Sequence, residues 1–345
     1  MKTVLITGGA GFLGVYLSRF LLKKGFKIIC LDIAPFTARD IEKKITYVKA
    51  DIRNAKLMEK ELKSVDYVVH AAAALPIIHD RSEIFKTNVD GTRNILKAAL
   101  KNKIKKLVFI SSTATYGVPK HLPETETDDI APIGHYGESK VKGEELCFEF
   151  LGKGLPINII RPKTFLGPER LGVFTLWFEA VYKNKPVFIL GNGNNLYQLL
   201  EVNDLCDMIY NALITKKSGE IFNAGAAKFG TWRKDLGALI KHAKSKSKIV
   251  GFPVLPSQLA LGFLEALNLS PIVAWHYKTL PVNSYVSIEK AKKELGFKPK
   301  KSNQDILIES YDWYAKNRDQ FIGKVGTGHR VVWDFKLLSI FDKLS

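Results

Sequence analysis

The chain of 345 residues is poor in cysteine, and its cysteines follow no spacing that would hold a metal ion or build a disulfide framework. The three thiols, Cys30, Cys147 and Cys206, stand far apart. Metal sites usually place cysteines in close pairs, and small secreted domains carry many more of them. We therefore expect reduced, buried cysteines in a cytoplasmic protein, and we predict no metal site.

Long apolar runs and nucleic-acid motifs are also missing. No apolar run approaches the roughly 18 residues that a membrane-spanning helix requires, and the chain begins directly on a strand pattern, so we expect neither a spanning helix nor a signal peptide. The net charge of +18 suits anionic partners such as nucleotides, phosphates or anionic lipids, although a lysine-rich surface alone would also produce it. Because no long basic run or binding motif is present, we predict no nucleic-acid partner.

The stretch from Thr7 to Gly14 has the pattern of a phosphate-binding turn. It follows the apolar run 4–6, typical of a buried strand, and opens a segment of helical periodicity. Gly8 permits a tight turn, Gly11 lets a pyrophosphate approach the backbone, and Gly14 lets the helix pack closely. The helix N-terminus offers free amides and a positive dipole to phosphates. The stretch therefore predicts a dinucleotide site.

Asp32 lies about 20 residues beyond the first glycines, at the end of the next apolar run, where an acidic side chain accepts hydrogen bonds from the adenosine ribose. Its charge would repel a 2′-phosphate, so it favours NAD over NADP. The alternative is that Asp32 is only a turn or cap residue.

Other small and polar residues follow the later strand patterns. Asp51, before Ile52, is placed to reach the adenine or to cap the next helix. Ala71, Ala72 and Ala73 are small enough for the cofactor ribose to lie against the backbone. Asn88 lies within a helical segment, where an amide has poor propensity. It either ties two strands together through backbone hydrogen bonds or is an ordinary solvated residue.

The first half of the chain alternates strand and helix patterns, which predicts a parallel sheet. Expected strands are 3–7, 27–31, 46–49, 67–70, 106–110 and 157–161, and expected helices are 11–24, 56–63, 84–101 and 136–152, with Gly25 and Gly152 as helix stops. Turns become denser after Arg161-Pro162. The fold class is thus α/β: a Rossmann-type doubly wound parallel sheet with a smaller C-terminal α/β substrate domain. We assign 1–163 and 204–225 to the NAD-binding domain, 164–203 and 226–317 to the substrate domain, and 318–345 to an amphipathic tail.

Tyr136 and Lys140 are four residues apart at the start of a helix, so they share one face. A phenol has a pKa of about 10, and a neighbouring ammonium together with the positive nicotinamide of NAD would stabilise its ionised form. Ser112, with Thr113 as second choice, follows a strand at the edge where open α/β sheets bind ligands, and its hydroxyl could bond the substrate oxygen that Tyr136 deprotonates. At this spacing a Tyr–Lys pair is more often a surface pair, and it gains meaning from the cofactor turn upstream.

The chain resembles an extended short-chain dehydrogenase/reductase of the NAD-dependent epimerase/dehydratase family, over about Met1 to Arg318. The matching pieces are Thr7–Gly14, Asp32, Asp51-Ile52, Ala71-Ala72, Asn88–Thr92, Ser111–Gly117, Tyr136–Lys140, Arg161-Pro162, Gly167-Pro168, Val202–Asp204 and Ala291–Phe297.

The resemblance implies a catalytic triad of Ser112, Tyr136 and Lys140, in which Lys140 also holds the nicotinamide ribose. It further implies cofactor contacts from the matching pieces, which include Phe12, Leu13, Ser111 and Pro162. Family enzymes are often dimers through a helix bundle, here 84–101 and 136–152.

Within the family, the segment Ser112–Thr115 resembles that of sugar epimerases such as UDP-glucose 4-epimerase. Dehydratases typically carry acidic residues after the triad hydroxyl, and Thr113 and Ala114 are not acidic. We therefore predict NAD-dependent 4-epimerisation of a nucleotide-linked hexose. Two substrate positions depart from the family: Thr164 stands where an Asn is common and Tyr197 where an Arg is common. Arg170 is a candidate to replace part of the lost charge.

Two apolar segments leave a second function open. Residues 253–269 form a helix that is apolar on nearly every side, which fits either a buried core helix or a substrate flap dipping into a membrane. In the tail, Trp333, Leu337, Ile340, Phe341 and Leu344 recur at helical spacing, so the tail docks on the body or a second subunit, or lies on a membrane. The alternatives to a nucleotide-sugar epimerase are therefore three. They are a dehydrogenase or epimerase that acts on a sterol or a polyprenyl-linked sugar at a membrane, a reductase that releases its cofactor, and a non-catalytic NAD-binding protein.

Overall fold

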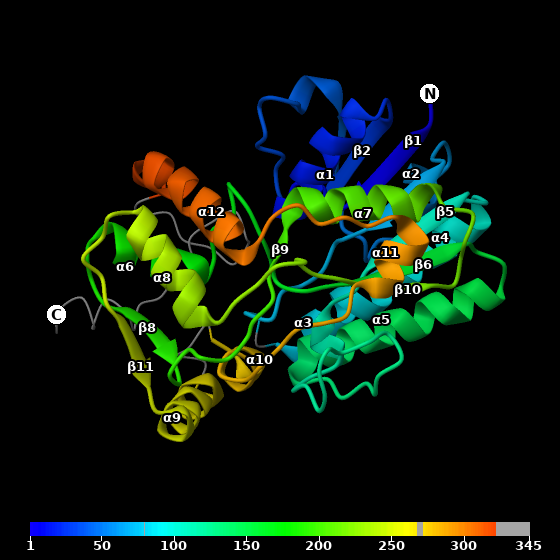
Figure 1. The fold of residues 1–345 in the computed structure, drawn as a ribbon. Helices are drawn as coiled ribbons and strands as arrows, with labels where there is room; N and C mark the ends of the chain where they lie inside the picture. The colour runs from blue at the N-terminus through cyan, green and yellow to red at the C-terminus, as the bar shows by residue number, and fades with distance from the viewer. Residues whose placement is uncertain (79, 268–271, 322–345) are drawn as a thin grey trace.

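The computed structural model describes residues 1–78, 80–267 and 272–321, and it contains one large sheet with a second group of helices and short strands beside it (Figure 1). The seven strands of the sheet are all parallel, in the order β10-β6-β5-β4-β1-β2-β3. The six strands that come first in the chain lie in the order β3-β2-β1-β4-β5-β6, which is that of the Rossmann fold. The strands are β1 (Thr3–Thr7), β2 (Lys27–Asp32), β3 (Thr46–Lys49), β4 (Tyr67–His70), β5 (Lys106–Ile110), β6 (Ile157–Pro162) and β10 (Ile221–Ala224). The predicted strands and fold class are confirmed.

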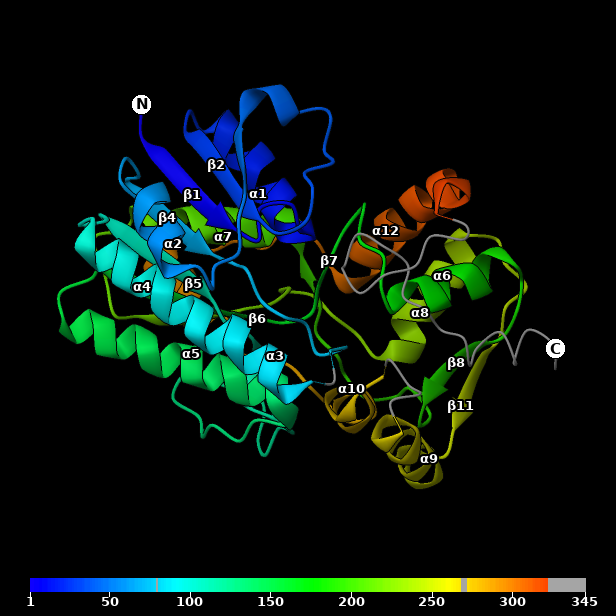
Figure 2. The same ribbon diagram turned by 180° about the vertical axis from the view of Figure 1, so that it is seen from behind.

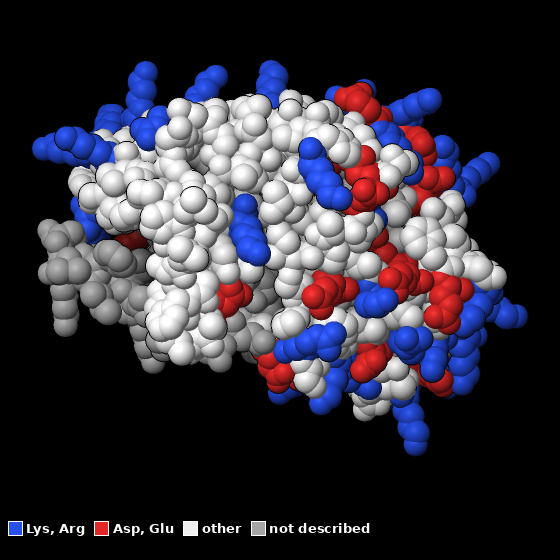
Figure 3. Space-filling view, turned by 90° about the horizontal axis from the view of Figure 1, so that it is seen from below, with Lys and Arg blue, Asp and Glu red and all other residues white. Residues whose placement is uncertain are grey.

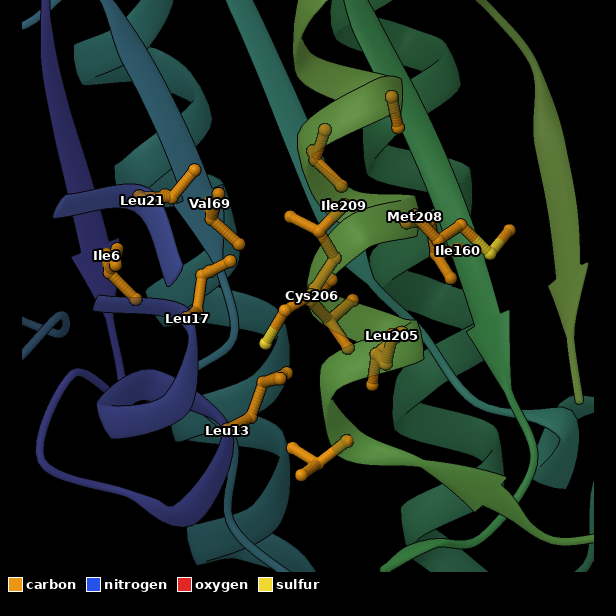
Figure 4. Close-up of a cluster of buried hydrophobic side chains, with 14 of the residues drawn as sticks. Ile6, Leu13, Leu17, Leu21, Val69, Ile160, Leu205, Cys206, Met208 and Ile209 are labelled. Carbon is orange, nitrogen blue, oxygen red and sulfur yellow. The ribbon is translucent and has the colours of Figure 1, made fainter. Parts of the chain in front are cut away.

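Helices cover both faces of the sheet because the central strands are apolar on both sides. On one face, α1 (Phe12–Lys23), α7 (Val202–Ile214) and α11 (Glu289–Leu295) pack on alternate strand residues such as Ile6, Val69 and Ile160 (Figure 4). The other face of the sheet is covered by α2 (Ala55–Glu61), α4 (Thr92–Lys101) and α5 (Gly134–Gly152) (Figure 2). These helices pack on the strand residues that point the opposite way, such as Leu5, Val68 and Ile159. All three cysteines are buried and unpaired, as expected.

The helix predicted over residues 84–101 is divided. It consists of α3 (Arg81–Phe85), a π-helical turn at Lys86–Gly91 and α4. Inside the turn, the Asn88 amide accepts from Ala74 N at 2.7 Å and donates to Ala74 O and to Ser139 Oγ. Asn88 therefore ties the loop after β4 to α5. The expectation that Asn88 joins two strands is wrong, because it joins a loop to a helix. The alternative of a solvated residue is wrong as well, because Asn88 is buried.

The second group of elements surrounds an aromatic core of its own. It contains two small parallel pairs, β7 (Phe165–Leu166) with β9 (Leu200–Glu201) and β8 (Val187–Leu190) with β11 (Ile249–Phe252). Three helices, α6 (Phe174–Tyr182), α8 (Trp232–His242) and α12 (Asn303–Asn317), pack around Phe178 and Tyr311.

Short 3-10 turns occur at Glu42–Lys44, Thr113–Thr115 and Arg318–Gln320.

Two further helices, α9 (Val254–Ala266) and α10 (Ala274–Thr279), lie at the lower end of this group in Figure 1. None of the residues of α9, all of which are described, is buried, so the interpretation of 253–269 as a buried core helix is wrong. No helix among residues 1–78, 80–267 and 272–321 is both long and apolar enough to cross a bilayer. The predicted tail helix from Trp333 to Leu344 lies outside the described residues.

The two predicted helix stops have different outcomes. Gly25 has a left-handed φ of 81° two residues after the end of α1 at Lys23, as expected. Gly152 is instead the last residue of α5, and Gly154, with a φ of 94°, takes the left-handed position.

Candidate active site

The carboxyl ends of the parallel strands bring most of the predicted site residues to one edge of the sheet. The glycine turn follows β1, the three alanines follow β4, and Ser111 and Ser112 follow β5. Open α/β sheets bind their ligands at this edge.

The glycine turn is too crowded for side chains. Gly8 has a φ of +70°, and a Cβ there would lie 2.9 Å from Ala72 N. A Cβ on Gly14 would lie 2.3 Å from Gly8 O, which explains the close approach of α1 to the turn. Gly9, which the sequence pattern did not single out, faces Cys30. A Cβ on Gly9 would lie only 2.7 Å from the Cβ of Cys30.

The N-terminus of α1 is open to an anion. Among the described side chains none caps the helix at Gly11, and its first turn carries no acidic residue. The amides of the first turn, including those of Phe12 and Leu13, are left for a ligand. The side chains of Phe12 and Leu13 are themselves buried in the core. The turn thus fits the pyrophosphate of a dinucleotide.

The carboxylate of Asp32 joins the glycine turn to the loop after β2. It accepts from Ala10 N at 3.0 Å and from Ala34 N at 2.9 Å, and it remains partly exposed. Asp32 therefore acts as a turn residue here, and its contact with a ribose stays a prediction.

Asp51 is an ion-pair partner and not a helix cap. It binds Arg53, which also binds Glu83, and the hydrogen bond from Arg53 lowers the pKa of Asp51. Asn54 caps α2 instead, since its side chain accepts from Leu57 N. Ile52 is buried, and Gly91 leaves space for its side chain.

A chain of buried hydrogen bonds fixes the loop after β4. Thr7 Oγ1 accepts from the amides of Ala71 and Ala72 and lies 2.7 Å from His70 Nδ1. On the other side of the ring, His70 Nε2 lies 2.8 Å from Thr92 Oγ1, which donates to Asn88 O. Because the Thr92 proton is already used, Nε2 is the donor and Nδ1 accepts from Thr7. His70 is thus neutral, and burial lowers its pKa to about 3. Ala73 follows in the same loop and is partly exposed.

Tyr136, Ser112 and Lys140 come together at the start of α5. Ser112 lies beside Tyr136 and lowers the pKa of its phenol, and the ammonium of Lys140 lies 5.7 Å from the centre of the Tyr136 ring. Lys140 Nζ donates to Ile110 O at 2.8 Å, and burial lowers its pKa to about 8. Lys140 is thereby anchored to the end of β5.

The electrostatics of Tyr136 differ from the sequence expectation. Burial raises the pKa of the phenol to about 12, while the neighbouring Ser112 hydroxyl and the charge of Arg170 lower it. The expectation that Lys140 and the nicotinamide of NAD together depress this pKa stays a prediction, and in the chain alone Lys140 is not the cation that lowers it. The reason is that Lys140 directs its charge to the Ile110 carbonyl, so Arg170 is the cation that acts on the phenol.

Arg170 is a buried cation without full hydrogen bonding. Its guanidinium lies 5.0 Å from the centre of the Phe165 ring and 5.5 Å from that of Phe12. Its Nε and Nη1 find no hydrogen-bond partner among the described residues, and burial lowers its pKa to about 9. Buried donors of this kind usually have a partner, so the geometry fits an anionic ligand between the glycine turn and Tyr136.

Ser111 has a different environment from Ser112. Its hydroxyl donates to Glu144 of α5, whose carboxylate also receives Arg161 Nε at 2.9 Å. Arg161 in turn bonds Tyr116, which bonds Asn223 of β10. The side chain of Ser111 is therefore engaged in a buried network between sheet and helix, which the sequence analysis did not foresee.

The predicted substrate residues divide into two groups. Thr113 is buried beside Pro162, whose carbonyl it approaches at 3.4 Å. Thr164 and Tyr197 lie together, with 3.3 Å between their hydroxyls, and the Tyr197 ring stacks on Trp232 with 4.5 Å between centroids. Tyr197 is thus part of the second core.

Two buried groups of opposite charge, Lys163 near Tyr197 and Glu124, were not predicted from the sequence. Lys163 donates to Ser284 Oγ at 2.7 Å and lies 4.9 Å from the centre of the Tyr197 ring. Burial lowers the pKa of Lys163 and raises that of Glu124, while each charge opposes the shift of the other. A lysine directly after Arg161-Pro162 carried no pattern that would have revealed it.

Tyr136 borders a cavity of about 230 Å³ whose lining is polar and apolar in equal parts. The lining residues are Pro76, Ile78, Ile84, Ile133, Gly134, His135, Tyr136, Glu265, Val273, Ala274 and Trp275. The last four come from α9, α10 and the residue before α10, so these two helices close the site from the side of the second group.

The fold and the site define an α/β enzyme that binds a dinucleotide at the carboxyl edge of its sheet and carries a Tyr–Lys pair on the adjoining helix. The chain belongs to the NAD dependent epimerase/dehydratase family, whose model matches residues 4–225. This match confirms the resemblance seen in the sequence, and NAD is the cofactor of the family.

Relatives match well beyond the glycine turn. A Sinorhizobium fredii protein named "Uncharacterized protein y4nG" is 35% identical over 343 residues, which are 99% of this chain and 85% of that protein. A Methanocaldococcus jannaschii protein named "Putative UDP-glucose 4-epimerase" is 31% identical over 326 residues, 91% of this chain and 99% of that protein. The crystal structure of UDP-glucose 4-epimerase from Thermotoga maritima, solved with UDP-glucose, superposes with a TM-score of 0.79 at 24% identity and covers 92% of this chain and 100% of that chain. This last likeness concerns the fold.

Proposed function

We propose that the protein is a sugar epimerase that inverts a secondary alcohol, with 4-epimerisation of a nucleotide-linked hexose as the leading version. The observation that carries this proposal is Tyr136, which lines the cavity, lies beside Ser112 and stands four residues before the buried Lys140. Tyr136 takes the proton of the substrate hydroxyl while the carbon loses a hydride and becomes a ketone. The reverse transfer to the opposite face of the ring restores the alcohol as the epimer, so the net reaction is redox-neutral.

When bound, NAD supplies the acceptor of that hydride and a positive charge beside the phenol. The residues that would hold it are the turn glycines Gly8, Gly11 and Gly14, Asp32 at the ribose, and Lys140 near the nicotinamide. Ser112 orients the substrate oxygen, and Arg170 balances the negative charge of the ionised phenol.

Isomerisation is favoured over dehydration by the residues around Ser112. Loss of water from a sugar requires a general acid near the leaving hydroxyl. Thr113 and Ala114 provide none, and Glu265, the one carboxylate that lines the cavity, is engaged by Tyr277 Oη and Ala274 N.

The cofactor state and a substrate panel test the proposal. Purified protein is denatured to look for released NAD, and UDP- and dTDP-hexoses are offered with detection of the C4 epimer. We expect retained NAD and epimer formation, with turnover lost and NAD binding kept in Tyr136→Phe. Tyr182→Phe, on an exposed tyrosine of α6, is the matched control. Net NADH production would point to a dehydrogenase, and NAD binding without turnover on any substrate would point to a binding protein.

We further propose that α4 and α5 form a dimer interface. The two helices pack side by side on one face of the sheet (Figure 2), and Phe148 of α5 is exposed there. Light scattering of the protein and of Phe148→Glu tests this, since the charge would break an apolar contact between copies. A monomer in both samples would contradict it.

A further inference from the structure

Helix α9 presents a row of large apolar side chains to solvent. Leu255, Leu259, Phe263 and Leu267, just after its end, are 73%, 76%, 66% and 51% exposed. Residues four apart lie on the same face of a helix, so the four form one stripe along α9. Soluble surfaces seldom expose a contiguous row of this kind without a binding role.

The apolar surface continues onto the neighbouring strands. Phe252 at the end of β11 and Phe188 on β8 are both exposed, and their rings lie 5.2 Å apart. Figure 3 views the molecule from the side on which α9 lies and shows a broad area there without charged side chains, whereas charges crowd the opposite half of the view. We call α9 with Phe188 and Phe252 the apolar face.

Exposed lysines border the apolar face, and the acidic residue of α9 turns away from it. The one charged residue of α9, Glu265, turns inward, where it accepts from Tyr277 Oη at 2.8 Å and from Ala274 N at 3.1 Å. Exposed lysines stand on the adjoining segments, with Lys278 on α10 and Lys246 and Lys248 leading into β11. An apolar row with a cationic border complements the surface of an anionic bilayer, which offers hydrocarbon below a layer of negative headgroups.

The inner side of the same helices faces the active site. Glu265 of α9 and Ala274 and Trp275 of α10 line the cavity that Tyr136 borders. A bilayer in contact with the outer side of α9 would therefore lie one helix away from the reacting oxygen.

We propose that the apolar face seats in the surface of an anionic bilayer and presents the Tyr136 cavity to an alcohol carried on a lipid tail. The sugar would enter the cavity, and its apolar carrier would remain along α9 and in the membrane. The docking stands without any assumption about the reaction. The lipid-carried substrate rests on the proposed function.

Sedimentation of the full chain with vesicles tests the docking. We expect binding to vesicles containing phosphatidylglycerol, weaker binding to phosphatidylcholine alone, and a decrease in high salt because exposed charges are screened. The variant Leu259→Ser/Phe263→Ser should bind at least about tenfold less, as expected when buried apolar area sets the affinity. Ile214→Ser, which removes an exposed apolar side chain at the end of α7, is the matched control and should bind normally. Circular dichroism checks that each variant is folded.

Four results would overturn the docking. Equal vesicle binding by wild type and the double variant would exclude the apolar face, and absence of binding by wild type would exclude the membrane. A protein dimer that dissociates in the double variant would identify a second copy as the occupant. A chain ending at residue 322 should still bind, and loss of binding on that truncation would assign the anchor to the tail.

The substrate half is tested by comparing a polyprenyl-linked hexose in vesicles with a nucleotide-linked hexose in solution. The double variant should lower the rate on the lipid-linked substrate and spare any rate on the soluble one. Tyr136→Phe should lose turnover and keep vesicle binding. Binding without turnover of the lipid-linked substrate would overturn only the substrate, whereas turnover of it that is insensitive to the double variant would overturn the membrane route and leave the epimerase intact.

Discussion

The guanidinium of Arg170 acts on the phenol of Tyr136 across the candidate site and lowers its pKa, although the two residues lie on different elements. Arg170 follows β7 and reaches the site over the rings of Phe12 and Phe165. The sequence offered Arg170 only as a replacement for a lost charge at the substrate. The structure places it between the glycine turn and Tyr136, where its unpaired donors can serve both an anionic ligand and the phenolate.

The first prediction concerns Arg170→Leu. Removing the cation disfavours the ionised phenol, so the pKa of Tyr136 rises and the acidic limb of the kcat/KM profile moves to higher pH. The rate at neutral pH should fall by at least about tenfold, one pKa unit of lost stabilisation. Arg170→Lys keeps the charge and should shift the profile less. An unmoved acidic limb in Arg170→Leu would show that the phenol ionises without this cation.

The second prediction concerns Gly14→Ala. The new Cβ would lie 2.3 Å from Gly8 O, so the turn must move, and we expect a loss of about 1–3 kcal/mol in unfolding free energy. NAD affinity should fall as well, because the shifted turn no longer matches the pyrophosphate. Calorimetric titration with NAD and urea unfolding measure both effects.

The control is Gly237→Ala in α8, where a Cβ would meet nothing within 4 Å. It should stabilise the protein by about 0.5–1 kcal/mol through helix propensity and leave NAD binding unchanged. Equal NAD affinity in both variants would contradict the role of the turn.

The third prediction concerns Asn88→Ala. The substitution leaves the buried N–H and C=O of Ala74 unpaired and removes a donor from Ser139. Each unpaired buried group costs about 1–3 kcal/mol, so we expect at least about 2 kcal/mol of destabilisation by urea unfolding. Asn211→Ala, on a partly buried helical asparagine with one long contact to Asp207, should cost much less. Similar losses in the two variants would mean that the Asn88 contacts add little.

The fourth prediction concerns pH and His70. Burial lowers the pKa of His70 to about 3, below its unfolded value of 6.5, so the unfolded chain binds the proton more readily. The stability from neutral His70 is full above pH 6.5 and is lost as the pH falls toward 3, by up to about 1.4 kcal/mol per pH unit. His276, whose pKa burial lowers to about 4, adds a slope of the same sign.

The measurement is urea unfolding of wild type and His70→Gln between pH 7 and pH 5. The variant lacks the titrating ring, so its stability should decline less over this interval. Parallel pH curves for the two proteins would show that His70 does not carry the effect.

Local sequence determined the strands, the glycine turn and the Tyr136–Lys140 pair, because each depends on residues near one another in the chain. Runs such as Val4–Ile6 are buried wherever a sheet forms, and Gly8 and Gly14 stand where no side chain fits. The tertiary structure decided which side chains are buried and which residues distant in the chain contact each other. Periodicity marks α9 as apolar but cannot tell burial from exposure, since both fit the same pattern. The π-helical turn at Asn88 and the charge of Arg170 beside Tyr136 likewise depend on partners distant in the chain.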